Sequence, residues 1–299
     1  MEIRHRILEF NNSPKFNILK EILDKLALRY TITQLGGKMQ SLEYYAYEKD
    51  VQFPYISEVI RKHHLYVQVG IEYSPEDFNN AEWFYAIGGE YLYPQPEDTW
   101  TGWDSNGMEV TYDLANFHSY CGIGAVQARP FRLKSDFKQK KIQFLGLHWV
   151  FDEIFVRPEA KIEIENAGFD GINFIHPVFH KTGLPIESVL QMKIQNMAKP
   201  GLVTKDLQPV TCKRDNEEGF YKNAKDFIPC GRVKYHFPNR TMMTFYRDSM
   251  KDLPDIARSS EYFGSGGAAN HLILVSRRFL DFYNQHGFRG LKFTPIELV

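Results

Sequence analysis

Apolar and polar residues alternate along the first third of the chain with two different periods. Apolar side chains recur every three or four residues over 13–28 and again over 55–64, which predicts two amphipathic helices. Residues 65–73 alternate between apolar and polar side chains and are expected to form a strand. A third helix is predicted from Ser74, which can cap it, to about Phe84.

The second half of the chain contains an internal repeat. Residues 154–174 align without a gap on residues 273–293, with six identical positions. Each copy reads as a short apolar strand, a helix of about ten residues and a second, alternating strand. Gly168 and Gly287 follow the two helices, where the chain turns into the left-handed region that glycine adopts at little cost. We interpret the two copies as duplicated scaffold.

A loop rich in turn formers separates the repeat region from the N-terminal helices. Residues 93–107 contain two prolines, two glycines and two tryptophans. We therefore predict an α+β fold with an N-terminal α+β region over residues 1–110. Two related strand–helix–strand halves are expected to follow over residues 111–299.

Composition and charge exclude several classes of protein. Lys plus Arg number 36 against 37 Asp plus Glu, so the net charge is −1, and a nucleic-acid partner is not expected. No run of 18 uninterrupted apolar residues occurs, so a membrane span is not expected either. Three widely spaced cysteines do not form a disulfide framework. These features are typical of a cytoplasmic protein.

Two Cys-Gly turns stand at comparable distances before the two repeats. Residues 118–122 read His-Ser-Tyr-Cys-Gly and residues 227–231 read Phe-Ile-Pro-Cys-Gly, so each resembles a CxxCG zinc knuckle with its first cysteine replaced. The candidate zinc ligands are His118, Cys121, Cys212 and Cys230. The alternative is that the cysteines are small apolar residues in tight turns. The sequence favours this alternative, because Phe227 cannot bind a metal and Cys212 belongs to no motif, so no cofactor is predicted.

Residues 230–293 carry a family resemblance. They run from Cys230-Gly231 through Leu253-Pro254-Asp255 to a strand, a helix and a Gly-x-x-Gly ending, and this order resembles the C-terminal end of the double-CXXCG motif family. Residues 148–178 resemble the family's inner copy of that unit. The resemblance covers about residues 117–299 and does not extend to residues 1–116.

This resemblance implies a bacterial protein and a binding role. Some members resemble or serve as immunity proteins, which neutralise a toxin exchanged between neighbouring cells. The implied function is a cytoplasmic immunity-type protein that occludes its cognate toxin. The resemblance implies a zinc site, although neither full CxxCG pair is retained here, and it brings no catalytic residues.

Enzymatic function has little support from motifs. The chain contains no Gly-x-Ser-x-Gly, His-Glu-x-x-His or Walker sequence. The neighbouring acids Asp152 and Glu153 are predicted to point to opposite faces of a strand, which argues against a catalytic pair. A hydrolase or nucleotide-modifying enzyme remains the alternative function. A zinc-ribbon nucleic-acid module is a third.

Two further features bear on binding. Arg232, Lys234 and His236 alternate along an expected strand, and such a stripe is usually a solvated face. Trp100, Trp103 and Asp104 lie in the turn-rich loop and are the candidate partner-binding residues, since exposed tryptophans often dominate binding energy. The alternative for the two tryptophans is inward packing.

Overall fold

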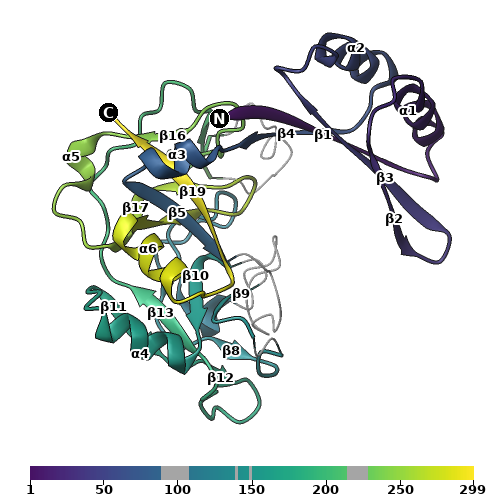
Figure 1. Cartoon of the computed structure of the whole chain (residues 1–299). Helices are drawn as coiled ribbons and strands as arrows, with labels where there is room; N and C mark the ends of the chain where they lie inside the picture. Colours follow the sequence, from purple (N-terminus) through teal and green to yellow (C-terminus); the bar gives the residue numbers. More distant parts are fainter. Residues whose placement is uncertain (89–107, 139–140, 148–149, 214–227) are drawn as a thin grey trace. The chain divides into compact units, whose positions relative to one another are not determined.

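The computed structural model describes residues 1–88, 108–138, 141–147, 150–213 and 228–299 (Figure 1). The chain divides into two compact units, each considered separately below. The first comprises Met1–Asn80 with Asn239–Met242, and the second comprises Ala81–Pro238 with Met243–Val299. Both units mix helices and strands, and the α+β class is confirmed. The sequence suggested a boundary near residue 110, whereas the units divide between Asn80 and Ala81.

The first unit is a four-stranded antiparallel sheet with helices inserted between its strands. Its sheet order is β2-β3-β1-β4, which is the split βαβ, or ferredoxin-like, arrangement. The elements are β1 (Glu2–Phe10), α1 (Pro14–Lys25), β2 (Thr31–Gly36), β3 (Met39–Tyr47), α2 (Phe53–His63), β4 (Val67–Glu72) and α3 (Pro75–Asn80). The sequence analysis correctly located α1, α2 and β4, but it did not identify β1, β2 or β3.

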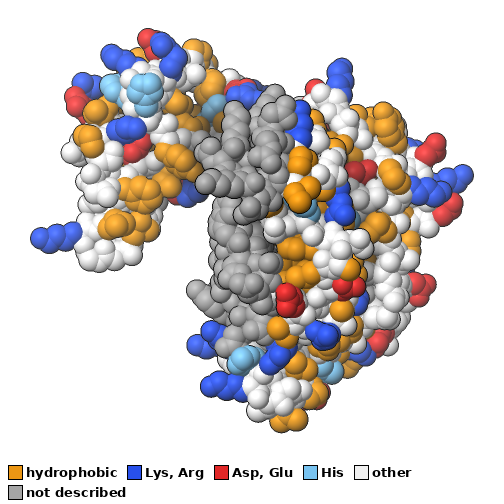
Figure 2. Space-filling model, turned by 180° about the vertical axis from the view of Figure 1, so that it is seen from behind, with side chains coloured by type: hydrophobic (Ala, Val, Ile, Leu, Met, Phe, Trp, Pro, Cys, Tyr) orange, Lys and Arg blue, Asp and Glu red, His pale blue; other side chains and the backbone are white. Residues whose placement is uncertain are grey.

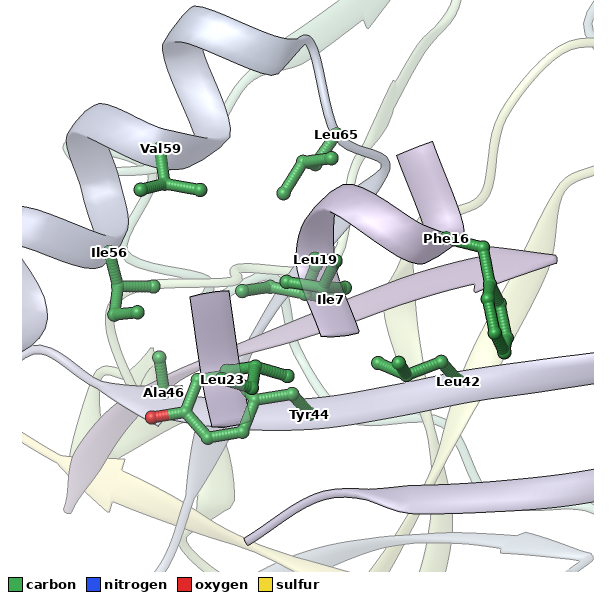
Figure 3. Packing of buried hydrophobic residues seen from close by; sticks show 10 residues of the cluster. All are labelled: Ile7, Phe16, Leu19, Leu23, Leu42, Tyr44, Ala46, Ile56, Val59 and Leu65. Carbon is green, nitrogen blue, oxygen red and sulfur yellow. The ribbon is translucent and has the colours of Figure 1, made fainter. Parts of the chain in front are cut away.

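The core of this unit lies between the two longer helices and the sheet (Figure 3). The Ser13 hydroxyl accepts a hydrogen bond from the Lys15 N–H and caps α1, as predicted. Apolar residues at helical spacing then face the strands. The buried cluster contains Ile7, Phe16, Leu19, Leu23, Leu42, Tyr44, Ala46, Ile56, Val59 and Leu65.

The third predicted helix is shorter than expected. Ser74 and Asp77 form the predicted capping box, in which each backbone N–H donates to the other side chain. The helix nevertheless ends at Asn80, and β5 (Trp83–Gly88) follows it. The prediction that the helix reaches Phe84 was wrong, because Phe84 is fully buried in a central strand of the second unit.

The second unit contains two main sheets. The larger has seven strands in the order β14-β15-β17-β18-β5-β19-β16, and the smaller has the order β11-β13-β10-β9. The strands of these sheets are β9 (Phe144–Leu147), β10 (Val150–Val156), β11 (Ile172–Ile175), β13 (Leu190–Ile194), β14 (Pro209–Thr211), β15 (Val233–Tyr235), β16 (Met243–Phe245), β17 (Ile256–Phe263), β18 (Asn270–Ser276) and β19 (Leu291–Leu298). The remaining elements are η1 (Met108–Val110), β6 (Tyr112–Asp113), β7 (Val126–Gln127), β8 (Arg132–Leu133), α4 (Pro158–Asn166), β12 (Val178–Phe179), α5 (Arg247–Met250) and α6 (Arg277–Gln285).

The predicted strand–helix–strand pattern of both repeats is confirmed. The first copy is β10-α4-β11 and the second is β18-α6-β19. In each copy the two strands are separated by one inserted strand that is antiparallel to both, β13 in the first and β5 in the second. Because β5 completes the second copy, residues before the 93–107 loop belong to the second unit.

The two helices end in the same way. After α4, Gly168 has φ +67°, and after α6, Gly287 has φ +62°. The N–H groups of Gly168 and Phe169 donate back to Glu165 and Ile164. The equivalent bonds run from Gly287 and Phe288 to Asn284 and Tyr283. Both ends are therefore Schellman motifs, which satisfy the last helical carbonyls.

Aromatic rings join the two copies. The Phe169 ring, next to the first Schellman glycine, lies 5.3 Å from Phe279 and 4.9 Å from Phe282 of α6. In return, Phe288 lies 5.5 Å from Phe144 of β9. Aromatic residues make up 15% of the chain, and this contact between sheets accounts for part of them.

Two features of the surface relate to expected partners. No helix in the described ranges is long and apolar enough to cross a membrane, since the longest, α1, has 12 residues and a span needs about 20. On the face shown in Figure 2, basic and acidic side chains are interspersed, in keeping with the net charge of −1.

We expect Gly168→Ala to destabilise the protein by about 1–2 kcal/mol, because a side chain with a Cβ must then adopt a left-handed backbone. Gly168→Asn is the matched comparison and should lose less, since asparagine tolerates this conformation. Urea denaturation followed by circular dichroism measures both. Equal stability of wild type and Gly168→Ala would contradict the assigned role of this glycine.

Candidate metal centre

Four side chains from three separate segments converge in the second unit. Their potential ligand atoms all lie within 4.8 Å of one another, and they belong to His118, Cys121, Cys212 and Cys230. Two of the thiols are buried, and the imidazole and the third thiol are partly buried. The structure thus brings together all four zinc candidates that the sequence offered.

The first turn is closed by its own backbone. The His118 carbonyl accepts hydrogen bonds from the N–H groups of Cys121 (3.2 Å) and Gly122 (2.8 Å). Gly122 has φ +78°, and a Cβ there would lie 2.2 Å from the Gly267 carbonyl oxygen. Glycine is therefore required both by the conformation of the turn and by the close approach of a neighbouring loop.

The second turn is held beside Cys212. The Cys212 N–H donates to the Arg232 carbonyl (2.8 Å), and the Gly231 N–H donates to the Cys212 carbonyl (3.1 Å). This pairing continues the ladder between β14 and β15. Cys212 is therefore positioned by strand pairing. Because its pairing partner lies about 20 residues away, no local sequence motif indicates its role.

The distances suit a tetrahedral zinc ion. The Sγ atoms of Cys121 and Cys230 lie 3.8 Å apart, and Cys212 Sγ lies 3.5 Å from His118 Nδ1. With Zn–S about 2.3 Å and Zn–N about 2.0–2.1 Å, the edges of a tetrahedral site are about 3.8 Å between sulfurs and about 3.6 Å between sulfur and nitrogen. The two sulfurs are too far apart for a disulfide bond, which has a length of about 2.05 Å.

A backbone carbonyl orients the imidazole. His118 Nε2 lies 2.8 Å from the Ile228 carbonyl oxygen, so Nε2 carries the hydrogen and donates it. In the neutral ring Nδ1 is then the unprotonated nitrogen, and it lies 3.5 Å from Cys212 Sγ. Metal-binding histidines are commonly oriented by such an outer hydrogen bond.

The pKa values of the three cysteines indicate which thiols are protonated when no metal ion is bound. Burial raises the pKa of Cys212 to about 12 and also raises the pKa of Cys121. Burial acts in the same direction on Cys230, but the Arg232 backbone N–H and the neighbouring thiols lower its pKa overall. Two of the three thiols therefore stay protonated unless a metal ion displaces their protons.

Lys234 fixes the first turn to a glycine-rich loop at residues 264–268. Its side chain is fully buried, and Nζ donates to the carbonyls of Cys121 (3.0 Å), Ala268 (2.8 Å) and Gly266. The interpretation of the 232–236 stripe as a solvated face was therefore wrong for Lys234. Arg232 makes a similar contact, since its Nη1 donates to the Asn116 and Ile123 carbonyls on either side of the turn.

Comparison with protein-family models and with curated proteins gives no match. The resemblance to the double-CXXCG family therefore stays a prediction from motifs.

The other predicted site residues have different outcomes. The partner-binding candidates Trp100, Trp103 and Asp104 lie outside the described residues.

The acids Asp152 and Glu153 do not point apart as the alternation argument required. Both contact Arg258, at 3.3 Å and 2.7 Å. The reason is a register irregularity in β10 between residues 150 and 155, which breaks the alternation of the strand.

Lys234→Met should destabilise the protein by about 3 kcal/mol, because it removes the charged donor that three buried carbonyls share. The exposed Lys199→Met is the matched control and should change stability by less than about 0.5 kcal/mol. Chemical denaturation of both variants checks this, and equal stabilities would show that the buried ammonium is dispensable.

Proposed function

We propose that the second unit binds one structural zinc ion through His118, Cys121, Cys212 and Cys230. The observation that supports this most strongly is the convergence of four soft donor atoms, within 4.8 Å, from segments far apart in sequence. Three thiolates and an imidazole form a donor set typical of structural zinc sites. Since the protein supplies all four ligands, the ion would have no open position for a substrate, and its role is to hold the segments together.

The surrounding charges support the metal-bound form. Zn²⁺ with three thiolates and a neutral imidazole has a net charge of −1, and the buried ammonium of Lys234 supplies the balancing positive charge. Its contact with the carbonyl of Cys121 places this cation directly beside the ligand turn.

Protein purified without chelator should contain about one zinc per chain by elemental analysis. Chelation should lower the melting temperature by roughly 6–12 °C, the shift expected if the ion contributes about 3 kcal/mol to a domain of this size. Zinc content well below one per chain would support the apolar interpretation of the two turns.

His118→Asn should lose most of the bound zinc, because it removes the only nitrogen ligand and its oriented tautomer. His64→Asn is the matched control. His64 lies outside the cluster, and its left-handed backbone (φ 48°) suits asparagine. If both variants retain the same zinc, the ion is bound elsewhere.

Zinc retention should fall as the pH is lowered. The ligands bind as thiolates and neutral imidazole, so metal binding releases protons and acid competes with it. The raised pKa of Cys212 without metal strengthens this competition. The difference in melting temperature between zinc-loaded and chelated protein should therefore be larger at pH 8 than at pH 6. A difference that does not change with pH would argue against thiolate coordination.

We further propose that the whole chain is a cytoplasmic immunity-type binding protein that neutralises a toxin by occlusion. The support is the motif resemblance over residues 117–299 together with a closed metal site, which suits a stable binding scaffold better than metal-dependent catalysis. The alternative, a hydrolase or nucleotide-modifying enzyme, has no comparable motif in its favour.

This role is tested by affinity purification from the native cell followed by mass spectrometry. A toxin-like protein should be recovered with the wild type and be depleted with Trp100→Ala/Trp103→Ala, since tryptophans are frequent binding hot spots. The melting temperature of the double variant should match that of the wild type. Equal recovery of the partner would remove these two residues from the binding surface, and recovery of metabolic enzymes alone would favour the alternative.

A further inference from the structure

A cavity of about 80 Å³ lies next to the candidate metal centre. Its lining includes Gly122 and Gly124, at and just after the first Cys-Gly turn, together with Asp152 of β10 and Tyr262 of β17. Both strands have register irregularities here, between residues 150 and 155 and between residues 258 and 262. Bulges of this kind are frequent beside functional sites, where they redirect side chains.

Aromatic rings supply much of the cavity wall. Tyr112, Phe117 and Tyr262 all line it. Burial raises the pKa of both tyrosine hydroxyls, well above the usual value for Tyr112, so these rings are neutral at physiological pH. The aromatic part of the cavity wall is therefore uncharged.

Among the described residues that line the cavity, Asp152 is the only Asp, Glu, Lys or Arg. It shares Arg258 with Glu153, and Glu153 makes the closer contact, 2.7 Å against 3.3 Å. Glu153 is also the more buried, with 6% of its side chain exposed against 21% for Asp152. Two carboxylates thus share one guanidinium, and burial raises the pKa of Glu153. Asp152, the more exposed of the two, is the carboxylate that lines the cavity.

His271 also lines the cavity and adds no positive charge. Burial lowers its pKa, with Arg258 acting in the same direction and Asp152 against it. Its ring hydrogen-bonds the backbone of Ser259 and Glu261, while its Nδ1 has no partner. The hydrogen bonds therefore come from Nε2–H. A neutral ring in this tautomer leaves Nδ1 as a bare acceptor.

We propose that this cavity binds a small cationic nitrogen group, a guanidinium or alkylammonium ion, with the Asp152 carboxylate as its counter-ion. The rings of Tyr112, Phe117 and Tyr262 provide the aromatic surroundings that favour such cations. The carboxylate accepts charge-assisted hydrogen bonds from the N–H donors of the ligand. The site requires no metal ion and is independent of the zinc proposal.

The size of the cavity limits the ligand to a head group. A cavity of about 150 Å³ accommodates the six heavy atoms of benzene, so one of about 80 Å³ suits about three. The N–C–N end of methylguanidinium meets this limit. The same chemistry occurs in free amines and guanidines and in the side chains of arginine and lysine.

The test is a titration of the full chain with methylguanidinium chloride, followed by NMR of backbone amides. We expect saturable shifts at Gly122 and Gly124. Methylurea has the same shape without the charge and should bind at least tenfold more weakly. Equal binding of the two compounds, or no saturable shift with methylguanidinium, overturns the proposal.

Asp152→Asn should weaken methylguanidinium binding at least tenfold while preserving the shape of the side chain. Glu187→Gln, which changes an acid that is 77% exposed, is the matched control and should bind as the wild type does. If Asp152→Asn does not fold, Phe117→Leu replaces it and should weaken binding several-fold through the lost π-face. Unchanged affinity in the folded variant refutes the assigned role of the residue it alters.

Two arms of the titration distinguish the sources of the cation. A blocked Gly-Arg-Gly peptide that competes with methylguanidinium identifies a side chain of a protein partner. Competition by free methylammonium but not by the peptide identifies a small metabolite. If neither competes, methylguanidinium binds at another place and the proposal fails.

Discussion

Three thiols and one imidazole share a space less than 5 Å across, and this convergence constrains the surrounding part of the second unit. It joins the 118–122 turn to the end of β14 and to the turn before β15, at the edge of the seven-stranded sheet. Lys234 and Arg232 extend the constraint by donating to carbonyls of the first turn and the glycine-rich loop. Burial makes ionisation of Cys121 and Cys212 unfavourable. The proposed zinc ion would favour their ionisation and would link the three segments.

The scaffold around this centre reuses one arrangement. Each copy of the repeat is a strand, a helix and a strand with one antiparallel strand inserted between them. The first unit has the same split arrangement in its own sheet. Within the second unit, rings adjacent to the two Schellman turns pack across the copies, so the glycines that end the helices also position the aromatic contact. Cavity and metal centre lie beside each other, and Gly122 belongs to both regions.

The repeat could be predicted because its signals are local: helix periodicity, a glycine at the helix end and an ungapped second copy. The inserted strands could not, since β5 comes from a distant part of the chain and pairs with β18 and β19 only in the folded sheet. The candidate ligands were identifiable by residue type, but Cys212 enters through strand pairing. Alternation wrongly separated Asp152 from Glu153 because an irregularity in β10 has no clear sequence signature. Lys234 was misassigned because its acceptors are backbone carbonyls, which no sequence pattern reveals.

The donor set is the central claim, and zinc X-ray absorption spectroscopy tests it most directly. Protein purified without chelator is expected to show a first shell of three sulfur atoms at about 2.3 Å and one nitrogen at about 2.0 Å. This result would establish that all three cysteines bind one ion together with a histidine. A shell of oxygen and nitrogen alone, or protein without zinc, would contradict the account. The cysteines of the two Cys-Gly turns would then be small apolar residues that pack in tight turns.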